Sequence, residues 1–84
     1  TAAICAAPMV LAEAGVLDGK RATSYPGALD GLPGVTVVAT AVVQDGKVLT
    51  SRGPGTAMDF ALALVETLTG AENRRQVEAA LVRP

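Results

Sequence analysis

The segment AAICAAP, residues 2–8, constrains the fold more than any other stretch of this sequence. It begins with an apolar run without alternation, Ala2 to Ile4, which is typical of a strand covered on both faces of a parallel sheet. It ends at Pro8, a residue favoured in the first turn of a helix because its missing N–H costs nothing there. The only cysteine of the chain, Cys5, lies between the two. The segment therefore predicts a sharp strand-to-helix junction that carries a thiol.

The pattern that follows predicts further alternation of strands and helices. The first helix should end near Gly15, and a short strand is expected at Lys20–Tyr25, before a loop over residues 28–34. Residues 35–51, VTVVATAVVQDGKVLTS, are rich in β-branched residues and predict strand structure, with a two-residue hairpin turn at Asp45-Gly46. Such alternation indicates parallel pairing and a layered α/β core.

Two helices are expected to close the sequence. Thr56, with Asp59 three residues later, resembles a capping box that opens a helix ending at Gly70, and a second helix starts at about Glu72. The first of these helices should bury one apolar face, with Asp59 and Glu66 on its solvent side. That face and the residues that widen it are Ala57, Phe60, Ala61, Leu64 and Leu68, together with Met58, Leu62 and Val65. The charged residues of the last helix, Arg74, Arg75 and Glu78, are predicted to form an exposed face and no more.

Composition excludes several classes of function. Seven basic and eight acidic residues give a formal net charge of −1 without a basic stripe, which argues against binding of nucleic acid through phosphates. With one cysteine and no histidine, the chain can form neither a disulfide framework nor a Cys/His zinc site, and no cofactor is expected. No apolar run reaches the ~20 residues of a membrane span, and no signal peptide leads the chain, so a cytoplasmic location is predicted.

The position of Cys5 permits two interpretations. A residue at a strand-to-helix turn lies at the carboxyl edge of the sheet, where open α/β folds bind their ligands. The helix N-terminus that follows favours a thiolate and can stabilise an oxyanion, and the small neighbours Ala3 and Ala6 suit the crowded backbone of a nucleophile elbow. Alternatively, Cys5 is an inert, buried small residue, as free cysteines often are.

Two longer segments carry a resemblance to a known family. The segments AAICAAPMVLAEAGVLDGKRATSYPG and DGKVLTSRGPGTAMDFALALVETLTG resemble the C-terminal half of the ThiJ/PfpI superfamily, in the branch of the parkinsonism-associated deglycase. The resemblance implies a flavodoxin-like three-layer sandwich with a mostly parallel sheet. Residues 1–84 would then be the C-terminal part of a single domain whose N-terminal half, of roughly 100 residues, precedes them. Such a half would also supply neighbours to Ala2–Ile4, which reads as a central strand.

The resemblance also implies roles for three residues. Cys5 would be the nucleophile, the backbone N–H of Ala6 would belong to the oxyanion site, and Tyr25 would lie in the pocket where some members have a histidine. A glutamate hydrogen-bonded to the thiol should come from the N-terminal half, because none of the acidic residues here matches its position. Tyr25 has another interpretation, as an aromatic residue at the edge of the core.

Three functions follow from these residues. The first is a cofactor-free cysteine-dependent glyoxalase or deglycase, which acts on methylglyoxal-type carbonyls or glycated thiols and amines through a hemithioacetal on Cys5. The second is a redox-sensing stress protein or chaperone with Cys5 as the oxidisable thiol. The third is a peptidase, but peptidase members of the superfamily have a histidine directly after the cysteine, and Ala6 stands there.

The resemblance finally implies a homodimer with the loop RGPGT near its interface. In this interpretation Arg52 and Pro54 are exposed at the mouth of the active site. The same loop could instead serve only to aim the long helix that follows, with glycines at positive φ and Thr56 as the N-cap.

Overall fold

The computed structural model describes all 84 residues as an α/β arrangement of five strands, three α-helices and one 3-10 turn. In chain order the elements are β1 (Ala2–Ile4), α1 (Pro8–Glu13), β2 (Lys20–Ala22), β3 (Val35–Val37), β4 (Val42–Asp45), β5 (Val48–Ser51), η1 (Pro54–Thr56), α2 (Ala57–Thr69) and α3 (Ala71–Leu81). The predicted strand at residues 2–4 and the predicted helix beginning at Pro8 are confirmed.

The strands form two small sheets. In the first, β5 lies between β1, to which it is parallel, and β4, to which it is antiparallel. In the second, β2 and β3 are parallel. The sheet structure is therefore mixed, with two parallel pairs and one antiparallel hairpin. The α/β prediction is confirmed.

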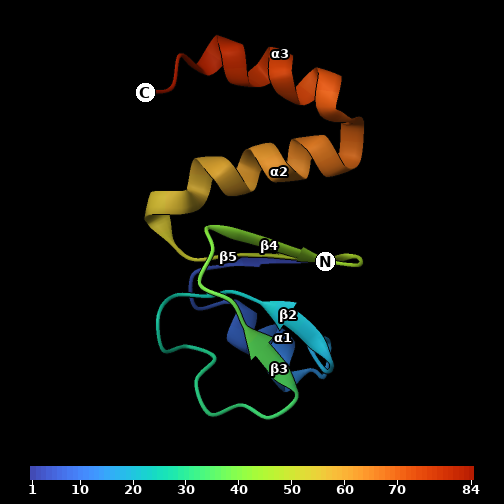
Figure 1. Ribbon diagram of the computed structural model, residues 1–84, viewed down its shortest axis with the longest axis vertical. Coiled ribbons are helices and arrows are strands. Elements are labelled where there is room, and N and C mark those ends of the chain that lie inside the picture. The colour runs from blue at the N-terminus through green and yellow to red at the C-terminus, as the bar shows by residue number, and fades with distance from the viewer.

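Helices cover both sides of the three-stranded sheet. In Figure 1 this sheet is seen edge-on, with α2 above it and α1 below it beside β2 and β3. Between this sheet and the lower layer lies a core of four buried residues, Leu17, Ala22, Leu29 and Val48, on which Leu11, Ala12, Val16 and Val35 pack. This core holds α1 in place and with it the turn that precedes the helix.

The expected strand structure over residues 35–51 is divided in the structure. Residues 38–41 belong to no strand, and β3 on one side of them pairs in a different sheet from β4 on the other. β-Branched composition marks residues that suit a pleated surface, but it does not indicate where a chain leaves one sheet for the next. The predicted strand at Lys20–Tyr25 likewise ends early, at Ala22. There the N–H of Thr23 donates to the side-chain Oγ1 of Thr50 on β5 (2.9 Å) rather than to a backbone carbonyl of a neighbouring strand.

The hairpin is present, one residue later than predicted. Asp45 pairs with Val48, so the two loop residues are Gly46 and Lys47. Of these only Gly46 has a positive φ, 61°, as in the type II′ turn that places glycine first. Asp45, which was predicted to lie in the turn, is the last residue of β4. Its carboxylate accepts a hydrogen bond from the backbone N–H of Arg21 (2.8 Å), which links β4 to β2.

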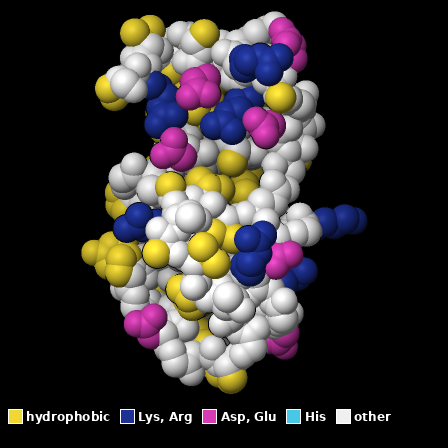
Figure 2. Space-filling view, in the orientation of Figure 1, with side chains coloured by type: hydrophobic (Ala, Val, Ile, Leu, Met, Phe, Trp, Pro, Cys, Tyr) yellow, Lys and Arg dark blue, Asp and Glu magenta, His cyan; other side chains and the backbone are white.

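The last helix folds back over α2 and supplies partners to the charged residues on the solvent side of α2. In Figure 1, α3 lies on the side of α2 remote from the sheet. Asp59 and Glu66, predicted to face solvent, therefore form ion pairs with Arg83 (2.9 Å) and Arg74 (3.2 Å). Of the predicted apolar face, Leu62 is buried at 1% exposure, whereas Leu68 is 78% exposed. Figure 2 shows the resulting mixture of basic and acidic side chains over the half of the molecule formed by α2 and α3.

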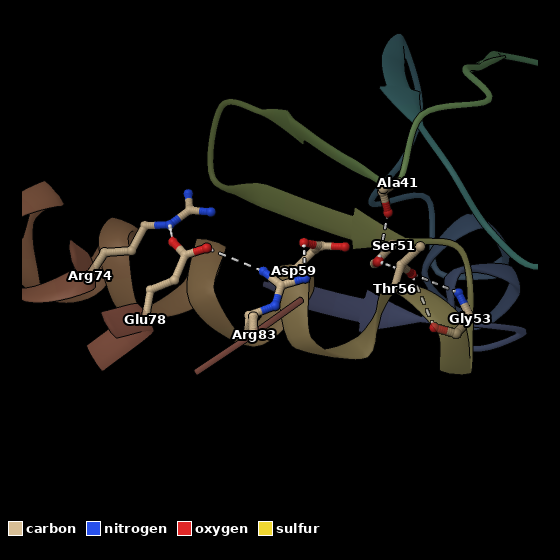
Figure 3. A network of polar contacts seen from close by, with 8 residues as sticks. All are labelled: Ala41, Ser51, Gly53, Thr56, Asp59, Arg74, Glu78 and Arg83. Carbon is tan, nitrogen blue, oxygen red and sulfur yellow. Dashed lines mark hydrogen bonds and ion pairs between the residues drawn. The ribbon is translucent and has the colours of Figure 1, made fainter. Parts of the chain in front are cut away.

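Arg74 and Glu78 consequently do more than form an exposed helix face. Glu78 bonds both Arg74 (3.5 Å) and Arg83 (3.3 Å), so one chain of alternating charges joins the two helices, as Figure 3 shows in part. Each pair is partly exposed, and such pairs contribute little stability singly. None of the helices is both long and apolar enough to cross a membrane.

Candidate active site

Cys5 occupies a strained backbone position directly after β1. Its φ is 65°, in the left-handed region, and only one other non-glycine residue of the chain has a positive φ. For an L-residue this conformation costs roughly 1–2 kcal/mol and persists only where the surroundings impose it. Here two backbone hydrogen bonds do so. The N–H of Cys5 donates to the carbonyl of Ser51 (3.1 Å), and its carbonyl accepts from the N–H of Tyr25 (2.7 Å).

The turn after Cys5 leaves one backbone donor free. The N–H of Ala7 donates to the carbonyl of Ile4, and that of Met9 donates to the carbonyl of Ala6, each at 3.1 Å. The N–H of Ala6 takes part in none of the hydrogen bonds of the chain, and Ala6 is exposed. Cys5 itself is half-buried and its thiol is free. A free N–H next to a thiol can donate a hydrogen bond to the oxygen of a carbonyl group that the sulfur attacks, and so stabilise the negative charge that develops there.

Tyr25 lies next to this turn, but not as part of the core. Its backbone joins Cys5 through the hydrogen bond described above, while its side chain is 53% exposed. The ring lies against Gly53, where an added Cβ would be 3.5 Å from Cδ2. A surface pocket of about 310 Å³ lies here, lined by Tyr25, Pro26, Arg52, Gly53, Pro54, Gly55 and Thr56. The fold thus brings the three predicted site residues and the RGPGT loop to one edge of the sheet.

The loop is held by a hydroxyl pair that the sequence did not single out. Ser51, fully buried, donates to the carbonyl of Ala41 (2.7 Å), and its Oγ lies 2.7 Å from Oγ1 of Thr56. Oγ1 of Thr56 accepts a hydrogen bond from the N–H of Gly53 (3.1 Å) and lies within donating distance of the Gly53 carbonyl (3.0 Å), as Figure 3 shows. Thr56 is the residue before α2, but its side chain makes no hydrogen bond to the helix, so the predicted capping box with Asp59 is wrong.

No side chain of the 84 residues forms a hydrogen bond or ion pair with the thiol. No hydrogen bond joins Cys5 to an acidic side chain, and no group of three or more His, Cys, Asp or Glu residues lies close enough together to hold a metal ion. The polar groups at this edge of the sheet are instead a backbone N–H, a phenol, hydroxyls and the guanidinium of Arg52.

Comparison with known proteins places these features in a family. The sequence profile of the DJ-1/PfpI family matches residues 1–67. DJ-1beta of Drosophila melanogaster is 49% identical over 83 residues, which are 96% of this chain and 44% of that protein. Isonitrile hydratase of Pseudomonas putida is 39% identical over 80 residues, which are 93% of this chain and 35% of that enzyme.

The solved structures agree with the sequence comparison. The crystal structure of Drosophila melanogaster DJ-1beta superposes with a TM-score of 0.91 at 48% identity, over 99% of this chain and 46% of that one. The oxidized DJ-1 of Toxoplasma gondii gives a TM-score of 0.88 at 39% identity, over 96% of this chain and 45% of that one. The chain therefore spans less than half the length of these relatives.

Proposed function

Because this chain belongs to the DJ-1/PfpI family, we propose that it carries the nucleophile of a cofactor-free enzyme that acts on small reactive carbonyls. The substrates would be methylglyoxal-type aldehydes, or thiols and amines that such aldehydes have glycated. The single observation that carries the proposal is the strained elbow at Cys5, with the free N–H of Ala6 after it. Strain of this kind is concentrated at functional sites, and nucleophile elbows have this strand–turn–helix context.

The proposed reaction needs only a thiolate, an oxyanion donor and proton transfers. The sulfur of Cys5 adds to the aldehyde carbon of methylglyoxal, and the carbonyl electron pair moves to oxygen, where the N–H of Ala6 donates a hydrogen bond. Protonation gives a hemithioacetal. The proton on C1 then moves to C2 through an enediol, which leaves a thioester. Water cleaves the thioester, so that the net change is addition of one water and release of lactate.

The proposal includes an acid from outside these 84 residues. No carboxylate of the chain hydrogen-bonds Cys5, and the matched relatives are more than twice as long as the chain. We therefore assign the thiol's acidic partner to a further segment of a longer, cytoplasmic protein. Tyr25 would line the pocket and confine the substrate rather than act as the base. The acidic partner, expected to be a glutamate, and solvent are then the groups that transfer protons during the reaction.

Replacement of the nucleophile tests this proposal. In the full-length protein, Cys5→Ser should lower the rate of lactate formation from methylglyoxal by at least roughly a thousandfold, because a serine hydroxyl without a base is a poor nucleophile. Circular dichroism and the thermal midpoint should stay close to those of the parent protein, since serine fits the same space. Retention of more than a tenth of the activity in Cys5→Ser would contradict the proposal.

A second candidate role is that of an oxidisable sensor thiol. Cys5 is the only thiol of the chain and is half-buried, and one relative, Toxoplasma gondii DJ-1, is described as oxidized. Attack of the thiolate on peroxide would give a sulfenate and water, and a second peroxide would give a sulfinate. Peptide mapping after limiting peroxide should find Cys5 oxidised first. A sensor alone would show this oxidation without any turnover of methylglyoxal.

We also propose that the full-length protein is a homodimer with residues 52–55 near the interface. Two-fold dimers are the commonest soluble assemblies, and Arg52, Pro54 and Gly55 are exposed here. Light scattering at micromolar concentration should give twice the mass of one chain. A monomeric mass under these conditions would exclude the dimer without bearing on the chemistry of Cys5.

A further inference from the structure

Arg52 is the one arginine of the chain whose side chain makes no hydrogen bond or ion pair. Arg21 donates to the carbonyl of Gln44 (3.4 Å). The other three, Arg74, Arg75 and Arg83, each bond a carboxylate in the α2–α3 region. A guanidinium presents five hydrogen-bond donors in a rigid planar fork, and none of those of Arg52 is used within these 84 residues.

The fold places Arg52 and Cys5 side by side in register. Ile4 at the end of β1 pairs with Ser51 at the end of the parallel strand β5. Cys5 and Arg52 are the next residues of each strand, so both leave the sheet at the same carboxyl edge. The backbone at Arg52 is fixed there, because its N–H donates to the carbonyl of Ala41 (3.3 Å). Ligands of open α/β sheets bind at edges of this kind.

Arg52 also lines two adjoining pockets at that edge. The first is the pocket of about 310 Å³ that it shares with Tyr25 and the RGPGT loop, and no acidic residue lines it. The second, of about 260 Å³, includes Thr23, Ser24 and Asp30. Asp30 is the only carboxylate in either pocket, and it forms no ion pair with Arg52. Within these 84 residues, Arg52 therefore lines the pocket beside Tyr25 without an ion-pair partner.

We propose that Arg52 is a specificity-determining residue that binds a carboxylate on the substrate of Cys5. The inference rests on the proposed function. It narrows the substrate class from 2-oxoaldehydes in general to 2-oxoaldehydes that carry an anionic group on the carbon chain. A carboxylate can accept two parallel hydrogen bonds from the guanidinium, which fixes its orientation as well as its position. The aldehyde end of the same molecule would then point toward Cys5.

Alkylation of Cys5 tests the inference without any need for turnover. Iodoacetate and iodoacetamide are nearly the same size and both lose iodide as the sulfur–carbon bond forms, but only iodoacetate is negatively charged. In the full-length protein, the rates at the Cys5 peptide are measured by mass spectrometry for the parent, Arg52→Gln and Arg52→Lys. The control is Arg75→Gln, which removes the same charge from an exposed ion pair on α3.

The measured quantity is the ratio of the iodoacetate rate to the iodoacetamide rate. Arg52→Gln should lower it by roughly three- to tenfold, the range expected for loss of one partly exposed charge contact. Arg52→Lys should give an intermediate ratio, and Arg75→Gln should leave the ratio of the parent. An unchanged ratio in Arg52→Gln would overturn the inference. So would an equal fall in Arg75→Gln, or a Cys5 that neither reagent modifies.

Turnover separates this inference from the function on which it rests. Methylglyoxal is a neutral 2-oxoaldehyde and 4,5-dioxopentanoate is one with a carboxylate. Arg52→Gln should lower kcat/KM roughly three- to tenfold more for the anionic substrate than for the neutral one, mainly through KM. If the parent consumes neither aldehyde, the proposed function fails, and the alkylation ratio still decides the role of Arg52. If the parent consumes both and Arg52→Gln changes them equally, only the inference about Arg52 fails.

Discussion

At the scale of single residues, the strain at Cys5 is the feature that connects the fold to the proposed chemistry. The left-handed backbone conformation is normally adopted by glycine. Backbone hydrogen bonds to Ser51 and Tyr25 hold Cys5 in this conformation, which is unfavourable for a residue with a side chain. The conformation turns the chain so sharply that the N–H of Ala6 finds no partner within the protein. Strain and free donor thus have the same cause.

This strain predicts the order of stability of two variants. Cys5→Gly should be more stable than Cys5→Ala by about 1 kcal/mol, because glycine adopts a positive φ without penalty and alanine does not. Ala61, an exposed residue in the interior of α2, is the control, and there Ala61→Gly should lose roughly 0.5–1 kcal/mol. Free energies of unfolding from chemical denaturation provide the comparison. Equal stability of the two Cys5 variants would mean that the elbow is not strained.

Part of the site could be predicted from the sequence. An apolar run, a cysteine among alanines and Pro8 together indicate a strand-to-helix junction, and that junction is confirmed. The free N–H of Ala6 and the unpaired side chain of Arg52 could not be predicted. Both depend on whether the folded chain places a hydrogen-bond acceptor close enough to these groups, and residue types alone do not predict that.

At the scale of elements, the loop between β5 and α2 shows where local signals mislead. Thr56 and Asp59 have the spacing of a capping box, yet Thr56 bonds Gly53 and Ser51, while Asp59 bonds Arg83 from beyond α3. Both side chains therefore bond residues outside α2 rather than the backbone N–H groups of its first turn. Asp59 keeps 38% of its side chain exposed, as expected of the solvent side, but its ion pair with Arg83 could not be inferred from α2 alone, because it depends on the return of α3 over α2.

The role of Thr56 in this loop predicts a further pair of variants. Thr56→Val should cost about 1–2 kcal/mol of unfolding free energy, because the N–H of Gly53 loses its acceptor in a partly buried place. Thr56→Ser keeps the hydroxyl and should restore most of this loss. Denaturation of both variants measures the effect. A Thr56→Ser protein as unstable as Thr56→Val would show that the methyl group, rather than the hydroxyl, holds the loop.

At the scale of the whole molecule, the chain leaves several large apolar side chains exposed. Leu68 is 78% exposed, Val10 on α1 is 65% exposed, and Met9 beside it is 50% exposed. Met9 and Val10 lie together with Ala14 on one surface of α1, and contiguous apolar surface is where contacts with other protein segments are found. A further segment of a longer protein, proposed above as the source of the acid, would find suitable surface here. The α/β layers were predictable from strand–helix alternation. The exposed fraction of these side chains was not, because it depends on which other residues pack against them in three dimensions.

The proposed reaction requires that the sulfur of Cys5 bond covalently to the carbonyl carbon of the substrate. Its most direct test is acid quenching of the full-length protein during turnover of methylglyoxal, followed by peptide mapping. We predict an adduct of one methylglyoxal mass on the Cys5 peptide, which builds up to a steady level and disappears when the substrate is exhausted. Lactate formation at full rate with the Cys5 peptide unmodified at every time point would contradict the account.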